Sequence, residues 1–290
     1  MSYYKLLGFE REPFSTSPDP DFLYLSREHQ SALTNVLIEL RLNRGISVVL
    51  GDVGTGKTSL SRKLIRCLKD RGDFILHMVL DPCFESEYLF LNSLVRNFGV
   101  SLDLPPAEVR GHANVTVLDL KEALEKFLYM KNIVERKIVV LIIDEAQKLT
   151  EPMMEMLRVI LNYETNDQKL LQLVLLGQLE LHSRIKNIPN FFDRVSFKYT
   201  LNPLEFDEAK ELIHFRIRQA GYQSKSHLFL EGALRKIHKV SGGYPRKITM
   251  LCHRALKNMV MKNKWVVDEG LIDELVEEDI RSGWVTQILH

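Results

Sequence analysis

The stretch Gly51-Asp52-Val53-Gly54-Thr55-Gly56-Lys57-Thr58 decides the fold of this chain. It matches G-x-x-x-x-G-K-[ST], the pattern of a phosphate-binding loop between a strand and a helix. The apolar run Ile46–Leu50 precedes it, and a helical pattern follows it to Arg71. Backbone N–H groups of such a glycine-rich loop cradle phosphates, and the start of the next helix adds partial positive charge. The stretch therefore predicts a nucleotide-binding α/β fold.

The loop residues have different expected roles. Lys57 is expected to reach the β- and γ-phosphates of a nucleotide, and the Thr58 hydroxyl is expected to bind Mg²⁺. The predicted nucleotide-binding residues of the loop are Gly51, Asp52, Val53, Gly54, Thr55, Gly56, Lys57, Thr58 and Ser59.

A second motif follows the apolar run Ile138–Ile143, which is directly succeeded by Asp144 and Glu145. A strand that is apolar on both faces is typical of a parallel sheet covered by helices. Ligands bind at the carboxyl ends of such strands. We expect Asp144 to hold Mg²⁺, directly or through water, and Glu145 to orient and polarise the attacking water. Phosphoryl transfer depends on this positioning and on neutralisation of the γ-phosphate charge.

Two further polar residues are candidates for this site. Gln178 follows the expected strand Leu171–Leu176 and would contact the γ-phosphate or the water; the alternative is a loop amide bonded to backbone. Arg194 is a candidate arginine finger that projects from one subunit into the next. Its alternative role is a surface ion pair with Asp193 or another acid, and Arg184 is the second choice for the finger.

The pattern of elements predicts three parts. Residues 1–25 are expected to form an irregular arm, anchored by aromatic residues. Strands alternate with helices over 26–202, which predicts a parallel α/β sheet sandwiched by helices, with a long loop at 100–114. Residues 203–290 are expected to form a small all-helical lid, with helices at about 205–220, 228–240, 245–262 and 268–280.

Charge is segregated within the expected lid. Residues 235–264 hold nine Lys and Arg and no acid, and residues 268–279 hold seven Asp and Glu and no base. One interpretation is that the two stretches pair with each other. The other is a basic surface that faces phosphate, from a nucleotide or from DNA. Arg246 begins one of these helices and would reach back to the γ-phosphate; its alternative is a solvated arginine in a first turn.

Bulk composition narrows the class of protein. The chain has 290 residues and a net charge of +1, so no overall basic field requires nucleic acid as partner. Three widely spaced cysteines do not indicate a metal site or a disulfide framework, and a reducing cytoplasm is the simpler expectation. No apolar run reaches the roughly 18 residues of a membrane-spanning helix, so we expect no membrane span.

Together these residues resemble the AAA+ ATPases. The resemblance extends to Ile143–Gln147, Gly177–Leu181 and Gly242–Arg246, and so covers nearly the whole chain. The opening Pro13-Phe14-Ser15, Pro18-Asp19-Pro20 and Phe22–Ser26 are similar to the bacterial general secretion pathway A (ExeA-type) ATPases and their relatives in pilus and exopolysaccharide loci.

The resemblance implies an activity and a set of roles. It implies a Mg²⁺-dependent ATPase with ATP as cofactor, working in assembly or remodelling of a secretion or pilus-type system, as a homo-oligomeric ring or filament. Gln178 would stand at the sensor-1 place, Arg194 would be the finger, Arg246 would be sensor 2, and the arm around Pro13-Phe14 would wall the adenine. The alternatives are a transposition helper that coats DNA and a nucleotide-gated scaffold that hydrolyses ATP slowly.

Overall fold

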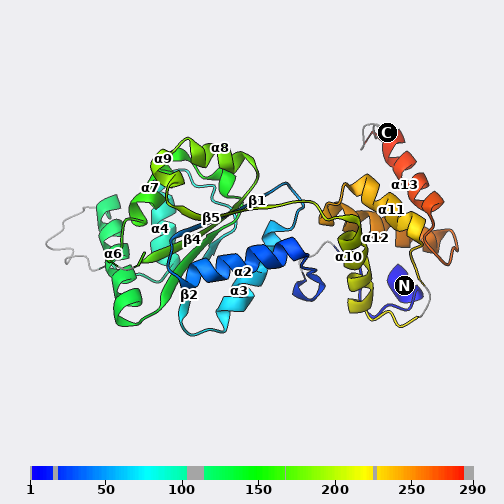
Figure 1. Cartoon of the computed structure of the whole chain (residues 1–290), viewed down its shortest axis with the longest axis horizontal. Coiled ribbons are helices and arrows are strands. Elements are labelled where there is room, and N and C mark those ends of the chain that lie inside the picture. The colour runs from blue at the N-terminus through cyan, green and yellow to red at the C-terminus, as the bar shows by residue number, and fades with distance from the viewer. Residues whose placement is uncertain (1, 16–18, 103–113, 167, 225–226, 284–290) are drawn as a thin grey trace. The chain divides into compact units, whose positions relative to one another are not determined.

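The computed structural model describes residues 2–15, 19–102, 114–166, 168–224 and 227–283. Pro18 of the opening motif and most of the expected loop at 100–114 lie outside these residues. The chain divides into two compact units. The sheet unit comprises Glu28–Asp52 and Leu60–Leu201; the helical unit comprises Met1–Arg27, Val53–Ser59 and Asn202–His290 (Figure 1).

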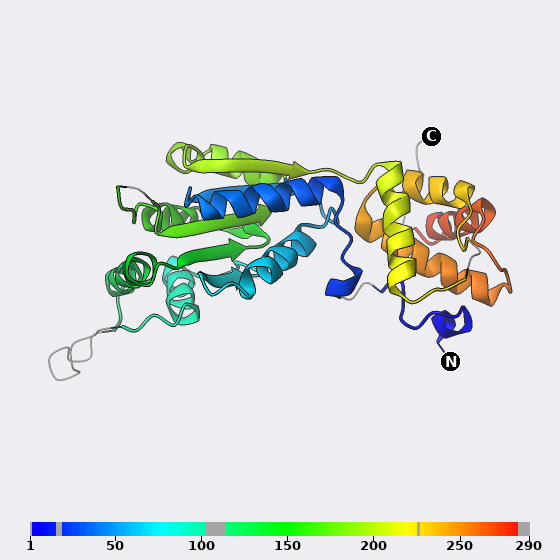
Figure 2. The same cartoon turned by 60° about the horizontal axis from the view of Figure 1, so that its bottom comes forward.

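The sheet unit is built on five parallel strands in the order β2-β3-β4-β1-β5. The strands point the same way in Figure 2. β1 and β4 are buried along their whole length, because helices cover both faces of a parallel sheet. Their bounds are β1 Ile46–Gly51, β2 Phe74–Val79, β3 Ile138–Ile143, β4 Leu171–Gly177 and β5 Val195–Leu201. The predicted α/β class is therefore confirmed.

The helices of the sheet unit connect these strands, except α2 (Arg27–Arg41), which precedes β1. Their bounds are α2 Arg27–Arg41, α3 Lys57–Lys69, α4 Glu87–Asn97, α6 Val117–Tyr129, α7 Glu151–Ile160, α8 Glu180–Lys186 and α9 Pro189–Phe192. The short helices α8 and α9 were not predicted from the sequence. Helix α6 begins with a capping box between Thr116 and Asp119, which satisfies two backbone donors at the helix start.

The helical segment that begins with α6 changes geometry near its end. A π-helical turn, Met130–Val134, follows α6. Asn132 is buried there, and its side-chain amide donates to the carbonyl oxygens of Leu128 at 2.9 Å and Leu170 at 2.7 Å. A buried amide needs such partners, and they are available in the wider turn.

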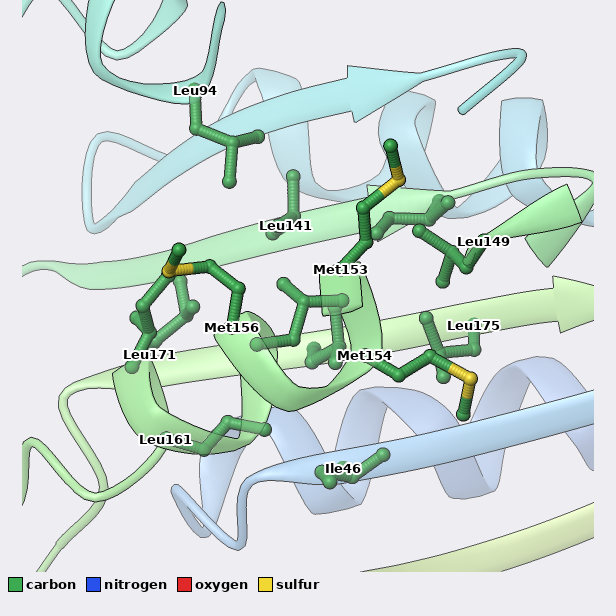
Figure 3. Packing of buried hydrophobic residues seen from close by; sticks show 14 of the residues in the cluster. Ile46, Leu94, Leu141, Leu149, Met153, Met154, Met156, Leu161, Leu171 and Leu175 are labelled. Atoms are coloured by element: carbon green, nitrogen blue, oxygen red, sulfur yellow. The ribbon is translucent and has the colours of Figure 1, made fainter. Parts of the chain in front are cut away.

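The core of the sheet unit is rich in leucine and methionine. Figure 3 shows Met153, Met154 and Met156 of α7 over leucines of β3 and β4, among them Leu141 and Leu171. All five side chains are at most 5% exposed. Burying each one contributes roughly 1.5–3 kcal/mol, and the flexible methionine fills irregular gaps. This core fixes the strands whose ends carry the site.

The helical unit packs four long helices around its own core. Their bounds are α10 Phe206–Gln219, α11 Glu231–Ser241, α12 Pro245–Met261 and α13 Glu269–Arg281. Gly242 and Gly243 separate α11 from α12, and both have positive φ. A Cβ at Gly243 would lie 2.3 Å from the carbonyl oxygen of Leu204, so only glycine fits this position.

The N-terminal arm belongs to the helical unit. Phe9, Phe14 and Phe22 are buried in the core of that unit. The Arg216 guanidinium of α10 donates to the carbonyl oxygens of Pro13 and Ser15, at 2.9 and 2.8 Å. The arm, which was expected to be irregular, contains two short elements: α1 (Tyr3–Leu6) and a 3-10 turn, η1 (Pro20–Phe22). Among the described residues, every helix is too short or too polar to traverse a bilayer.

Candidate active site

Three neighbouring strands of the sheet unit end in the predicted site residues. Asp144 follows β3, Gln178 follows β4, and Asp52 follows β1. Because β4 pairs with both β3 and β1 in parallel, all three residues lie at the same edge of the sheet. The strand that precedes Gln178 thus pairs directly with the strand that precedes the acidic residues.

The acidic pair is held by backbone contacts. Asp144 is only 2% exposed, and its backbone N–H donates to the Val79 carbonyl oxygen at 2.8 Å. The Glu145 N–H donates to the Asp144 Oδ1 at 3.0 Å. Glu145 adopts the left-handed conformation, with φ of 52°. A non-glycine residue in this conformation costs about 1–2 kcal/mol, and such strain gathers at functional sites.

Gln147 joins the ends of β3 and β4. It lies in a 3-10 turn, η3 (Ala146–Lys148), and is buried. Its Nε2 donates to the Glu145 Oε2 at 2.6 Å, and its Oε1 accepts the Gln178 backbone N–H at 3.1 Å. Gln147 had no predicted role, although its place two residues after Glu145 was the available signal in the sequence.

Arg184 and Arg194 have different surroundings. The Arg184 guanidinium of α8 donates to the carbonyl oxygens of Gln147 and Leu149, and so braces the turn that follows the acidic pair. Arg194 lies between α9 and β5 and is half-buried. It donates to the Asn190 carbonyl oxygen at 2.8 Å and to the Asn162 side-chain oxygen at 2.5 Å.

The phosphate-loop residues continue from β1 into α3, whose first residues are Lys57, Thr58 and Ser59. Gly54 and Gly56 have φ of +88° and +102°, which glycine adopts without strain. Within the helical unit, the Arg246 backbone N–H donates to the Gly54 carbonyl oxygen at 3.4 Å. Arg246 is the second residue of α12 and is exposed.

The rim of the sheet edge carries a charged pair. Lys148 Nζ lies 3.0 Å from the Asp81 carboxylate, which follows β2. Hydrogen bonds from Cys83 and from Lys148 lower the pKa of Asp81, and the bond to Asp81 raises the pKa of Lys148. Among the residues that the structure describes, no cluster of three or more His, Cys, Asp or Glu forms a metal cage.

Comparison with known proteins identifies a family and relatives that this chain resembles. Residues 40–185 match the family described as an AAA domain. The chain is 32% identical to general secretion pathway protein A of Aeromonas hydrophila over 256 residues, which cover 88% of this chain and 44% of that protein. It is 22% identical to an uncharacterised HTH-type transcriptional regulator of Methanocaldococcus jannaschii, covering 79% of this chain and 61% of that protein. The chain thus spans about half the length of these relatives.

Solved structures share the fold. The Aeropyrum pernix ORC2 protein, solved as ADPNP-ADP complexes, matches with a TM-score of 0.62 and 20% identity over 93% of this chain and 72% of that one. The Drosophila ORC bound to DNA matches with a TM-score of 0.66 and 18% identity over 96% of this chain and 66% of that one. Since the AAA domain match spans half of the sequence and includes the phosphate loop and the acidic pair, this chain belongs to the AAA+ family of P-loop ATPases.

Proposed function

We propose that this chain hydrolyses ATP in a Mg²⁺-dependent reaction, with Glu145 as the base that polarises the attacking water. The observation that carries this proposal is the shared edge of β3, β4 and β1, where Asp144, Gln178 and the start of the phosphate loop follow one another across the sheet. Ligands of open α/β sheets bind at this edge.

The residues present suit a magnesium-bound triphosphate. Mg²⁺ is usually held by one or two carboxylates together with substrate phosphates. In the proposed site the buried Asp144 would supply such a carboxylate, and the Thr58 hydroxyl would supply a further oxygen ligand. Bound Mg²⁺ would neutralise charge on the β- and γ-phosphates. Lys57 adds positive charge there, and the backbone N–H groups of Gly51–Ser59 orient the phosphates.

Arg194 and Arg246 complete the proposed site. Arg184 bonds to two carbonyl oxygens of the turn that follows the acidic pair, whereas Arg194 bonds to Asn190 and Asn162, which lie outside that turn, so we assign the finger to Arg194. Acting on a neighbouring subunit, Arg194 would exchange its bonds to Asn190 and Asn162 for the γ-phosphate, which requires a ring or filament. Arg246 would act as sensor 2 from residues 203–290, the lid, and the arm of residues 1–25 would wall the adenine.

The work to which hydrolysis is coupled is inferred from similarity. The 32% identity to general secretion pathway protein A supports a role in assembly or remodelling of a bacterial secretion or pilus-type system. A DNA-binding helper is the second candidate, because neighbours of this fold were solved with DNA and residues 235–264 are basic. The ion pairs made by several of these basic residues weigh against it.

The decisive experiment measures ATP turnover and binding of a fluorescent ATP analogue by the whole chain. Lys57→Ala and Glu145→Gln should each abolish turnover, and only Lys57→Ala should lose binding. The control Glu151→Gln, at the exposed start of α7, should behave as the parent. Turnover by Glu145→Gln at the parental rate would contradict the assigned base.

Two further measurements test the oligomer and the second candidate. A rate per subunit that rises with protein concentration would support shared sites, and duplex DNA binding that weakens with salt would favour the second candidate.

A further inference from the structure

The Glu145 carboxylate and the end of β4 are linked through one buried side chain. Gln147 is 7% exposed, and its amide uses both ends: Nε2 donates to Glu145 Oε2, and Oε1 accepts from the Gln178 backbone N–H. Hydrogen bonds to a charged acceptor are stronger than those between neutral groups, so the 2.6 Å bond to the carboxylate is the stronger of the two.

The surroundings of Gln147 fix its position from three sides. Arg184 holds the Gln147 carbonyl oxygen, and hence the backbone of the turn. Gly177 makes room for the side chain, because a Cβ there would lie 3.2 Å from Gln147 Oε1 and 2.6 Å from Leu181. The Lys148 N–H donates to the Glu145 carbonyl oxygen at 2.9 Å and closes the turn. A side chain held in this way transmits a displacement instead of absorbing it.

We propose that Gln147 is a positioning residue that aims the Glu145 carboxylate at the attacking water and couples its orientation to Gln178. This inference rests on the proposed function of Glu145. The bond from Gln147 engages Oε2, so Oε1 is the oxygen that accepts the proton of the water. Glu145 has a left-handed backbone conformation. The Gln147 amide donates a hydrogen bond to its carboxylate and so fixes the direction in which the carboxylate points.

The chemistry explains why an amide suits this place. It must donate at one end and accept at the other, and the side-chain amide of Gln carries both functions on one planar group without charge. Gln147→Met keeps the length and volume and removes both functions. Gln147→Glu keeps an oxygen that accepts from Gln178 but places a second carboxylate beside Glu145, where like charges repel.

The test is a double-mutant cycle on single-turnover ATP hydrolysis by the whole chain. The members are the parent, Gln147→Met, Glu145→Gln and the double variant, with Gln147→Glu as a second single variant. We expect Gln147→Met and Gln147→Glu each to lower the hydrolysis rate roughly 10- to 100-fold while ATP affinity stays within about twofold, because the base is misaimed and the phosphates are still held. In the Glu145→Gln background, Gln147→Met should have little further effect.

The outcomes separate this inference from the proposed function. If Glu145→Gln hydrolyses ATP at the parental rate, the proposed function fails. If Glu145 is required but both Gln147 variants hydrolyse ATP like the parent, or faster, only the positioning role is overturned. Multiplicative losses in the double variant would also overturn it, because a residue that only stabilises the fold affects the rate independently of Glu145.

Discussion

Around the turn after β3, polar side chains are buried or half-buried and bond to backbone or carboxylate groups, whereas charged side chains on and beside α12 and α13 pair with each other at a partly exposed surface. Gln147 and Arg184 represent the first region, where each bond reaches a backbone or carboxylate group of the sheet edge. The second region contains the pairs Arg254–Asp279 and Lys264–Asp268. Polar contacts of the two regions differ in burial, and therefore in what their loss costs.

The ion pairs of the second region explain why basic and acidic residues are segregated in the sequence. Basic residues of the stretch 235–264 meet acids of 268–279, so the interpretation that the two stretches pair is confirmed for these residues. The pairs are Lys236–Asp273, Arg254–Asp279, Lys262–Glu274 and Lys264–Asp268. Exposed pairs of this kind contribute about 0–1 kcal/mol each. The segregated charges in the sequence therefore indicate a solvent-exposed contact between neighbouring helices. The candidate active site is instead characterised by a few buried polar side chains.

The largest loss of stability in the helical unit is expected when a side chain is forced against the backbone. A loss of this size would show that the ion pairs contribute less to the stability of this unit than its backbone packing does. Gly243→Ala places a Cβ against the Leu204 carbonyl oxygen at a residue with φ of +75°. We expect it to lower the free energy of unfolding by about 3 kcal/mol. Gly270→Ala, where a Cβ meets nothing nearer than 3.8 Å, is the matched control and should be neutral or stabilising. Urea unfolding followed by circular dichroism measures both, and equal effects would contradict the contact argument.

The next prediction concerns the buried side of the comparison. Arg184→Met removes the charged donor from the Gln147 and Leu149 carbonyl oxygens, and should cost about 2–3 kcal/mol of unfolding free energy. Lys186→Met, an exposed position on the same helix, should change it by less than about 0.5 kcal/mol. Denaturant midpoints of the two variants test this, and a near-zero loss for Arg184→Met would remove the distinction between the regions.

Sequence patterns predicted the parts of the fold that repeat a simple rule. Strands such as Ile138–Ile143 are uniformly apolar, and the phosphate loop has a fixed spacing, so both were found at their true places. Gln178 was predicted to follow the strand Leu171–Leu176, and the structure places it directly after β4. Helix ends were predicted to within a few residues, since their caps and glycines are local signals.

Most features that the sequence did not predict depend on contacts between residues that are distant in the sequence. The brace from Arg184 to Gln147 spans 37 positions, and no spacing rule connects them. The π-helical turn depends on Asn132 reaching Leu170, a partner from another part of the chain. The short helices α8 and α9 lack a long apolar period, so the pattern gave little signal for them.

A smaller effect is expected at the start of α13, where the half-buried carboxylate of Asp268 bonds to the backbone as well as to a lysine. Asp268 accepts from the Leu271 N–H at 2.8 Å and pairs with Lys264, and the backbone bond first and the lysine second lower the pKa of Asp268. Asp268→Ala should cost about 1 kcal/mol at neutral pH. Because the folded pKa is the lower one, the cap contributes above the unfolded pKa and is lost as pH falls through the folded value.

The pH dependence separates the cap from a general effect of charge. The gap in unfolding free energy between the parent and Asp268→Ala should narrow in acid, when measured from pH 7 downward. Asp268→Asn keeps the capping acceptor without titrating, and should stay within about 0.5 kcal/mol of the parent at neutral pH. A gap that stays constant through the titration of Asp268 would contradict the assignment of the cap to the charged carboxylate.

The smallest effect is expected for the pair Lys262–Glu274, whose side chains are 45% and 53% exposed. A double-mutant cycle of Lys262→Met and Glu274→Gln should give a coupling free energy of about 0.2–1 kcal/mol, because water screens the charges and two long side chains lose freedom on pairing. The coupling should shrink further in about 1 M salt, where the screening length falls to about 3 Å. Urea unfolding of the four proteins at low and high salt measures it. A coupling above about 2 kcal/mol that persists in salt would mean that this pair behaves like the buried contacts after β3, and the contrast between the two regions would no longer hold.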